Sequence, residues 1–195
     1  MLQHRPPPLV EVVQGEVYGD ALDQEEYNKF KSGLRCWRDV LLAKLLRVTG
    51  LRVMELLRLE VYHYDVQGPE FSLLVHRSKK RKKDLGYEKV YLPPSLGVEV
   101  RDYIRGNHRE TSDKVFSISD RTLRYAFEKA GRKTLGRSVH PHELRHLYVK
   151  TLIDGGVPVL VASKLVGHSD PRVTQQWYYD LTTAQRRAIG ERMPT

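Results

Sequence analysis

The segment His140–His146 reads HPHELRH and contains residue types that could bind a metal or a phosphate. His142 and His146 are four residues apart, so they would share one face of a helix with Glu143 beside them, which is the HExxH pattern of zinc metalloproteases. In that chemistry Glu143 would activate a zinc-bound water. Arg145 stands between the two histidines, and its positive charge favours an anion over a divalent cation.

The zinc interpretation lacks a third protein ligand. Val149 stands where the HExxHxxG continuation requires glycine, and the next predicted helix, 159–166, contains no carboxylate. A zinc peptidase therefore remains a remote alternative. A second alternative is that these are ordinary polar residues on a solvated helix face.

The elements that would position this segment begin with two helices around Gly50. Trp37, Leu41, Leu45 and Val48 recur at helical spacing, which predicts a helix over 36–48. Gly50 interrupts the pattern, and the apolar residues of 51–59 resume it. Arg52 should therefore open a second helix.

Two apolar, β-branched and aromatic runs, Phe71–Arg77 and Tyr87–Leu92, predict strands that pair as a hairpin. The loop between them is basic. The rest of the chain is predominantly helical in pattern, with Gly131, Gly155 and Gly167 as expected stops. The predicted helices are 98–105, 122–130, 141–153, 159–166, 172–179 and 183–193. The fold class predicted is mainly α with a small antiparallel β-sheet (α+β).

Composition indicates one domain with a polyanionic partner. The 195 residues are 40% hydrophobic, and 33 Lys+Arg against 24 Asp+Glu give a formal charge of +9. Such a charge favours a nucleic acid or an anionic membrane surface. Cys36 is the only cysteine, and the first 15 residues lack the apolar core of a signal peptide. We expect a soluble, intracellular protein with an arm over 1–20 and one domain over 21–195.

Four sequence blocks, taken together and in order, resemble the catalytic domain of the tyrosine recombinase (phage-type integrase) family. They are TGLRVMELLRL (49–59), the hairpin with its lysine-rich turn, HELRHLYVKTLIDGG (142–156) and KLVGHSDPRVTQQWYY (164–179). Each block alone is weak evidence, but their joint order is specific. The resemblance covers about residue 21 to the C-terminus.

The resemblance implies six catalytic residues. It assigns them to two arginines, a hairpin lysine, two histidines and a nucleophilic tyrosine: Arg52, Lys79, His142, Arg145, His168 and Tyr178. The turn length leaves Lys80, Lys82 and Lys83 as alternatives for the lysine. The adjacent Tyr179 is an alternative nucleophile. It also implies that HExxH is here a coincidence of letters, with His146 as a structural residue.

These residue types suit phosphodiester cleavage on chemical grounds as well. Two arginines can fork onto the non-bridging oxygens, which gain negative charge during cleavage. A tyrosine with a reference pKa near 10 needs a neighbouring base or a positive field before it attacks. Histidines could accept its proton or hydrogen-bond to the phosphate, and a lysine can protonate the departing 5′ oxygen. No metal and no cofactor is required.

As a member of this family, the chain would be a cytoplasmic, nucleoid- or DNA-associated protein. It would cleave and rejoin double-stranded DNA through a 3′-phosphotyrosyl intermediate and act as a tetramer. Most members carry an N-terminal core-binding domain, and only about 20 residues precede the catalytic pattern here. We therefore expect that domain to be absent, either because the chain is a fragment or because it is a naturally minimal recombinase. A fragment would lose many phosphate contacts. A type IB topoisomerase-like activity and a noncatalytic DNA-binding relative remain alternatives.

Overall fold

The computed structural model describes residues 22–67, 70–76 and 86–166 of the chain. These residues fall into two compact units that meet within one helix, the first ending at Tyr148 and the second beginning at Val149. The two units are described separately. None of the helices in the described ranges has the length and apolarity needed to cross a bilayer.

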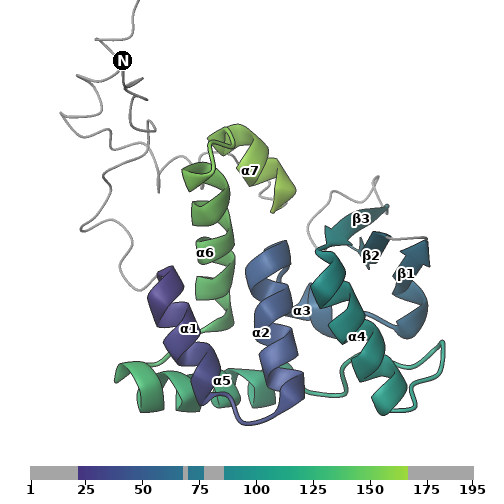
Figure 1. Cartoon of the computed structure of the whole chain (residues 1–195), viewed down its shortest axis with the longest axis horizontal. Coiled ribbons are helices and arrows are strands. Elements are labelled where there is room, and N and C mark those ends of the chain that lie inside the picture. Colours follow the sequence, from purple (N-terminus) through teal and green to yellow (C-terminus); the bar gives the residue numbers. More distant parts are fainter. Residues whose placement is uncertain (1–21, 68–69, 77–85, 167–195) are drawn as a thin grey trace, which may run out of the picture. The chain divides into compact units, whose positions relative to one another are not determined.

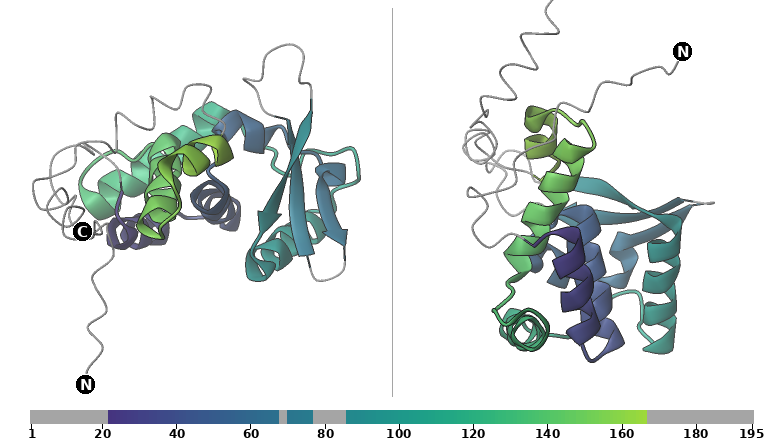
Figure 2. Two further views of the ribbon diagram at one scale, coloured as in Figure 1. Left: turned by 90° about the horizontal axis from the view of Figure 1, so that it is seen from above. Right: turned by 60° about the vertical axis from the view of Figure 1, so that its left-hand side comes forward.

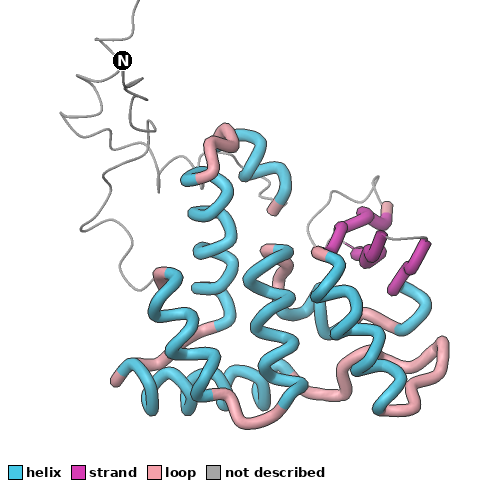
Figure 3. Tube along the Cα trace, viewed as in Figure 1, coloured by secondary structure: helices cyan, strands magenta, loops and turns pink. Residues whose placement is uncertain are grey.

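The first unit is mainly helical (Figure 3). Figure 1 shows α2 between α1 and α4, with α5 running across the lower ends of α1 and α2. Its helices are α1 (Gln24–Gly33), α2 (Trp37–Thr49), α3 (Val53–Leu57), the 3-10 turn η1 (Val61–His63), α4 (Pro94–Gly106), α5 (Asp120–Leu135) and the first part of α6 (Pro141–Asp154).

The sheet has three antiparallel strands in the order β1-β2-β3, formed by Tyr64–Gln67, Glu70–His76 and Tyr87–Leu92. Figure 2 (left) shows the strands side by side, with α4 lying against the sheet. The close approach of α4 depends on Gly97, because a β-carbon there would overlap the ring of Phe71 on β2. The backbone of α4 at Gly97 therefore packs directly against the ring of Phe71 on β2.

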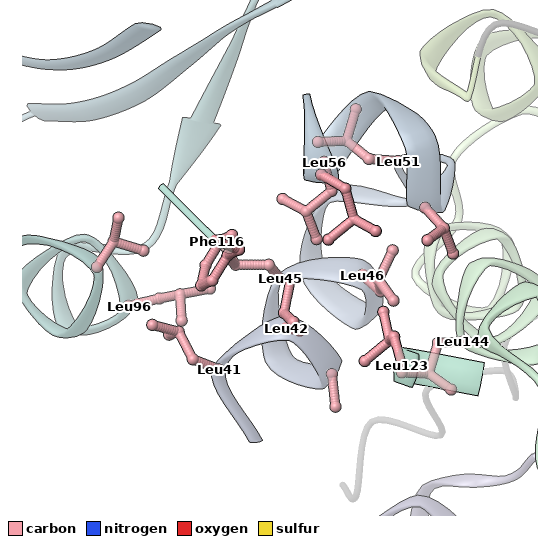
Figure 4. Packing of buried hydrophobic residues seen from close by; sticks show 14 of the residues in the cluster. Leu41, Leu42, Leu45, Leu46, Leu51, Leu56, Leu96, Phe116, Leu123 and Leu144 are labelled. Carbon is pink, nitrogen blue, oxygen red and sulfur yellow. The ribbon is translucent and has the colours of Figure 1, made fainter. Parts of the chain in front are cut away.

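The core of the first unit is built around α2. Leu41, Leu42, Leu45 and Leu46 of this helix are at most 1% exposed. Figure 4 shows them facing side chains from several other segments, namely Leu51, Leu56, Leu96, Phe116, Leu123 and Leu144. Burial of a large apolar side chain stabilises a fold by about 1.5–3 kcal/mol. This helix therefore fixes the positions of α3, α5 and α6, which carry the residues discussed below.

The second unit comprises the end of α6 and α7 (Val159–Leu165). Lys150 and Asp154 form an i,i+4 ion pair at 2.8 Å on the end of α6. Gly156, with φ of +87°, allows the chain to turn after the helix. Pro158 is the N-cap of α7, with φ of −56° set by its ring and ψ of 137°, which is the extended backbone usual at an N-cap.

Most predicted elements within the described residues are confirmed, with a difference at one glycine. Arg52 is the N-cap of α3, and the hairpin pairs Leu73 with Val90 as expected. The prediction that Gly131 stops a helix is wrong. Gly131 lies inside α5, where its missing side chain admits the backbone of Arg137 and Val139, and the helix ends at Gly136 with φ of +72°. Strand β1 and helix α1 were not predicted, and the helices 172–179 and 183–193 lie outside the described residues.

Candidate active site

Arg52 is held at the start of α3 by Glu55, one helical turn further on. The guanidinium donates through Nη1 to Glu55 Oε1 at 3.0 Å, and the Arg52 backbone N–H donates to Glu55 Oε2 at 2.9 Å. The Glu55 side chain is 0% exposed, whereas that of Arg52 is 24% exposed. The i+3 pair is therefore no surface salt bridge, and it anchors the arginine while leaving part of it open to the solvent.

Arg145 lies on α6 and is only 2% exposed. Its Nη1 donates to the backbone oxygen of Gly50 at 2.5 Å. Gly50 ends α2 in the left-handed region, with φ of 60° and ψ of 19°, and its position leaves no room for a side chain because a β-carbon would overlap the ring of Tyr148. The turn Gly50–Arg52 therefore carries one arginine and accepts a hydrogen bond from the other.

His142 lies one turn before Arg145 on the same helix. Partial burial, followed by the neighbouring His146, Arg145 and Arg52, lowers the pKa of His142 to about 4. The rings of His142 and His146 meet edge to face with centroids 4.7 Å apart, and burial also lowers the pKa of His146. Both imidazoles are therefore neutral at pH 7, and His142 can accept a proton or a hydrogen bond there.

Arg52, His142 and Arg145 line one cleft of about 390 Å³. Four arginines and one histidine contribute to it, and none of its lining residues carries a carboxylate: Leu51, Arg52, Val53, Met54, Arg58, Arg124, Pro141, His142 and Arg145. We call it the arginine cleft. The positive charges of its arginines favour an anion, and the guanidinium groups of Arg52 and Arg145, which are held by hydrogen bonds, suit a phosphate.

Two lining residues of the arginine cleft escaped the sequence analysis. Arg58 ends α3, and Arg124 lies on α5, where its Nε is held by both carboxylate oxygens of Asp120 at 2.9 Å. Arg58 lies in the TGLRVMELLRL block but was given no role there, and Arg124 lies in none of the four blocks. Only the packing of α5 against α3 brings Arg124 to the cleft.

The hydrogen-bond partners of Glu143 are not those expected for the catalytic base of a zinc peptidase. Its Oε2 accepts from Arg137 Nη1 at 2.7 Å, and its Oε1 accepts the backbone N–H of His140 at 2.6 Å, which caps the start of α6. It is 6% exposed and does not line the arginine cleft. In the part of the chain that the structure describes, no three His, Cys, Asp or Glu side chains gather as a metal site.

The structure thus brings together Arg52, His142 and Arg145 of the six predicted catalytic residues. The other three, Lys79, His168 and Tyr178, lie outside the described residues, as do the alternatives Lys80, Lys82, Lys83 and Tyr179. Their roles stay predictions.

Comparison with protein families matches residues 20–185 to the model described as "Phage integrase family". This chain belongs to the phage integrase family. The match includes the arginine cleft and the segment that carries His168 and Tyr178.

Curated relatives of this phage integrase domain include archaeal tyrosine recombinases. The XerA recombinase of Saccharolobus solfataricus is 31% identical over 169 residues, covering 87% of this chain and 54% of the relative. The XerA recombinase of Thermococcus kodakarensis is 32% identical over 185 residues, covering 88% and 62%. The chain thus spans little more than half the length of these relatives.

Solved structures share the fold of the phage integrase domain. A site-specific recombinase, XerH, bound to its difH substrate has a TM-score of 0.72 at 16% identity, covering 88% of this chain and 54% of that one. The Tn1549 transposon integrase in complex with transposon right end DNA has a TM-score of 0.70 at 18% identity, covering 88% and 65%. The predicted fold class, a tyrosine recombinase catalytic domain, is confirmed.

Proposed function

We propose that this chain is a DNA strand transferase of the site-specific recombinase type, which cleaves and rejoins double-stranded DNA through a 3′-phosphotyrosyl intermediate. The observation that carries the proposal is the arginine cleft, in which Arg52, His142 and Arg145 converge without a lining carboxylate. Membership of the phage integrase family and the DNA-bound structures of similar folds support it.

In this proposal Arg52 and Arg145 bind the non-bridging oxygens of the scissile phosphate. Both guanidinium groups stay charged at any working pH, so they offset the negative charge that grows on the phosphorane-like transition state. Glu55 and the Gly50 carbonyl hold them in place before DNA arrives. Little reorganisation is then needed at the moment of reaction.

Tyr178 attacks the phosphorus, the tyrosyl oxygen–phosphorus bond forms, and the bond to the 5′ oxygen breaks. His142, neutral at pH 7, and His168 accept the phenolic proton or hydrogen-bond to the phosphate. Lys79 of the hairpin turn protonates the departing 5′ oxygen. The phosphotyrosyl ester keeps the bond energy for rejoining, so neither ATP nor a metal takes part.

We propose that recombination, rather than relaxation of supercoils alone, is the outcome. The relatives that match over most of this chain are named tyrosine recombinases. Double-stranded DNA is the partner, and a homo-oligomer, in this family's manner a tetramer, brings two DNA sites together. The protein would accordingly be found with DNA in the cell.

The experiment that tests this function is the trapping of a covalent protein–DNA complex. The chain is incubated in EDTA with nicked or phosphorothiolate-bearing suicide duplexes, including DNA that flanks its gene, and the products are separated on a denaturing gel. We expect a complex that is lost in Tyr178→Phe and kept in Tyr179→Phe.

Other outcomes are equally informative. The reverse loss would move the nucleophile to Tyr179. A folded protein that binds duplex but never forms a complex would contradict the catalytic proposal and favour a DNA-binding role. Supercoil relaxation by a monomer, without exchange between two DNA sites, would favour the topoisomerase-like alternative. Activity only in the presence of zinc would overturn the assignment.

A further inference from the structure

Arg58 separates the arginine cleft from a second cleft, of about 290 Å³, which it also lines. The second cleft lies between the end of α3, the turn η1 and the two hairpin strands. We call it the η1 cleft. Its lining includes Glu55, Arg58, Glu60, Tyr62, His63 and Lys114, together with residues of both hairpin strands.

The charges of the η1 cleft favour an anion once its internal pairs are counted. The buried carboxylate of Glu55 is paired with Arg52, so its charge is already compensated. Glu60 is the remaining carboxylate of the lining. Arg58 and Lys114 contribute two exposed cations, which outnumber Glu60.

A buried histidine supplies the observation that points to a ligand. His63 is 8% exposed, and its Nδ1 accepts the backbone N–H of Glu60 at 3.0 Å, so Nε2 carries the proton of the neutral ring. Within the described residues this buried Nε2–H has no acceptor. A buried donor without a partner destabilises the fold, and native proteins rarely leave one unsatisfied.

The surroundings of His63 keep its ring neutral and leave a route to it. Burial lowers the pKa of His63, so at pH 7 it is a hydrogen-bond donor without charge. Its ring contacts those of Tyr62 and Tyr87, with centroids 4.1 and 5.2 Å away. Both tyrosines are themselves more than half exposed, so either can shift and open the Nε2–H to a ligand.

We propose that the η1 cleft is a second phosphate subsite, in which His63 Nε2–H, Arg58 and Lys114 bind the backbone phosphate next to the scissile one. The inference rests on the proposed function, since the arginine cleft must hold the scissile phosphate. Charges along one DNA strand follow each other every 3.4 Å of helix axis. A cleft that shares a wall with the arginine cleft therefore faces the next phosphate. A contact to one phosphate carries no sequence information, so the role of this subsite is to fix the register of the DNA strand on the protein.

The test removes one phosphate charge at a time. Neutral methylphosphonates replace, singly, the three phosphates on each side of the mapped cleavage position in the suicide duplex, and the rate of covalent complex formation is measured with the full chain. For the wild type we expect a loss of about tenfold at one flanking position. His63→Asn keeps an acceptor for the Glu60 N–H but lacks the distal donor, so it should be about tenfold slower on unmodified DNA and insensitive to that methylphosphonate.

Two variants control the test. His108→Asn also removes an imidazole, at an exposed position with φ of 49° that asparagine tolerates, and should retain the wild-type pattern. Glu60→Gln removes the carboxylate that opposes the phosphate and should raise the rate. If His63→Asn responds to every methylphosphonate as the wild type does, the subsite is overturned.

A second readout keeps this inference separate from the chemistry. In protein labelled with ¹⁵N-histidine, the His63 Nε2–H signal is assigned by its loss in His63→Asn and followed during titration with a short DNA duplex. A saturable shift supports the subsite even if no covalent complex forms, in which case the proposed function fails alone. An unmoved His63 signal while other signals shift on DNA binding would overturn the subsite and leave the proposed function standing.

Discussion

Arg145 reaches from α6 to the turn that carries the other arginine, and its Nη1 donates to Gly50 O at 2.5 Å. Residues 95 positions apart thus set the spacing of the two guanidinium groups. Gly50 can do this because it adopts φ of 60° and because Tyr148 packs where its side chain would be. The geometry of the arginine cleft therefore depends on a residue that has no side chain.

Replacing Gly50 should damage both stability and activity. Gly50→Ala forces a β-carbon into the left-handed region and against Tyr148, so we expect the free energy of unfolding to fall by about 1–3 kcal/mol and DNA cleavage to fall with it. Gly136→Ala is the matched control, since Gly136 has φ of +72° but open space around it. Urea unfolding measures the loss in free energy of unfolding in both variants, and the difference between them is the contribution of the overlap with Tyr148. Equal losses in the two variants would show that this overlap does not matter.

The structural and chemical roles of Arg52 can be separated through Glu55. Arg52→Met leaves the buried Glu55 carboxylate without the guanidinium, which should cost about 1–3 kcal/mol of stability. Adding Glu55→Gln should recover most of that loss, because a neutral amide tolerates burial better. Covalent complex formation should stay abolished in both. Recovery of cleavage in the double variant would show that Arg52 acts only as a structural partner.

Stability should fall as the pH drops from about 6.5 towards 4. His142 has a pKa of about 4 in the folded chain, against about 6.5 when unfolded, so in this interval the unfolded state binds more protons. His146 shifts in the same direction. Thermal unfolding across pH 4–7.5 should show the loss in the wild type and a flatter curve in His142→Gln/His146→Gln. An NMR titration of His142 with a midpoint near 6.5 would refute the explanation.

Glu143 should prove structural rather than catalytic. Glu143→Ala removes the acceptor for the His140 N–H and for Arg137, so we expect about 1–3 kcal/mol of destabilisation. At a temperature where the variant is folded, its rate of DNA cleavage should be within a few fold of wild type. EDTA should leave cleavage by the wild type unchanged. A loss of more than a hundredfold in the folded variant, or inhibition by EDTA, would restore the metal interpretation of HELRH.

The hairpin lysine can be identified by a change of leaving group. If Lys79 protonates the 5′ oxygen, the rate at which Lys79→Ala cleaves normal DNA should be lower than that of the wild type by about a hundredfold or more. A 5′-bridging phosphorothiolate leaves as a thiolate without that proton, so the variant should cleave it at nearly the wild-type rate. The same pair of substrates with Lys80→Ala, Lys82→Ala and Lys83→Ala decides among the alternatives, since only the proton donor should show rescue.

By itself, the sequence determined the mainly helical fold class, the hairpin and the family resemblance. These follow from local patterns: apolar spacing predicted α2, glycine at residue 50 predicted its end, and runs of β-branched and aromatic residues predicted β2 and β3. The family resemblance implied that Arg52, His142 and Arg145 belong to one site. Gly131 was misjudged because a glycine that serves packing looks the same in sequence as one that ends a helix.

Only the tertiary structure decided how the arginines are held and what else surrounds them. Glu143 turned out to cap α6 and pair with Arg137, although its motif suggested a catalytic base. Arg58 and Arg124 entered the cleft, and the Nε2–H of His63 was buried without an acceptor among the described residues. Each of these depends on contacts between segments far apart in the chain. Burial and charge in a cleft are properties of such contacts, so no local pattern of residues could have predicted them.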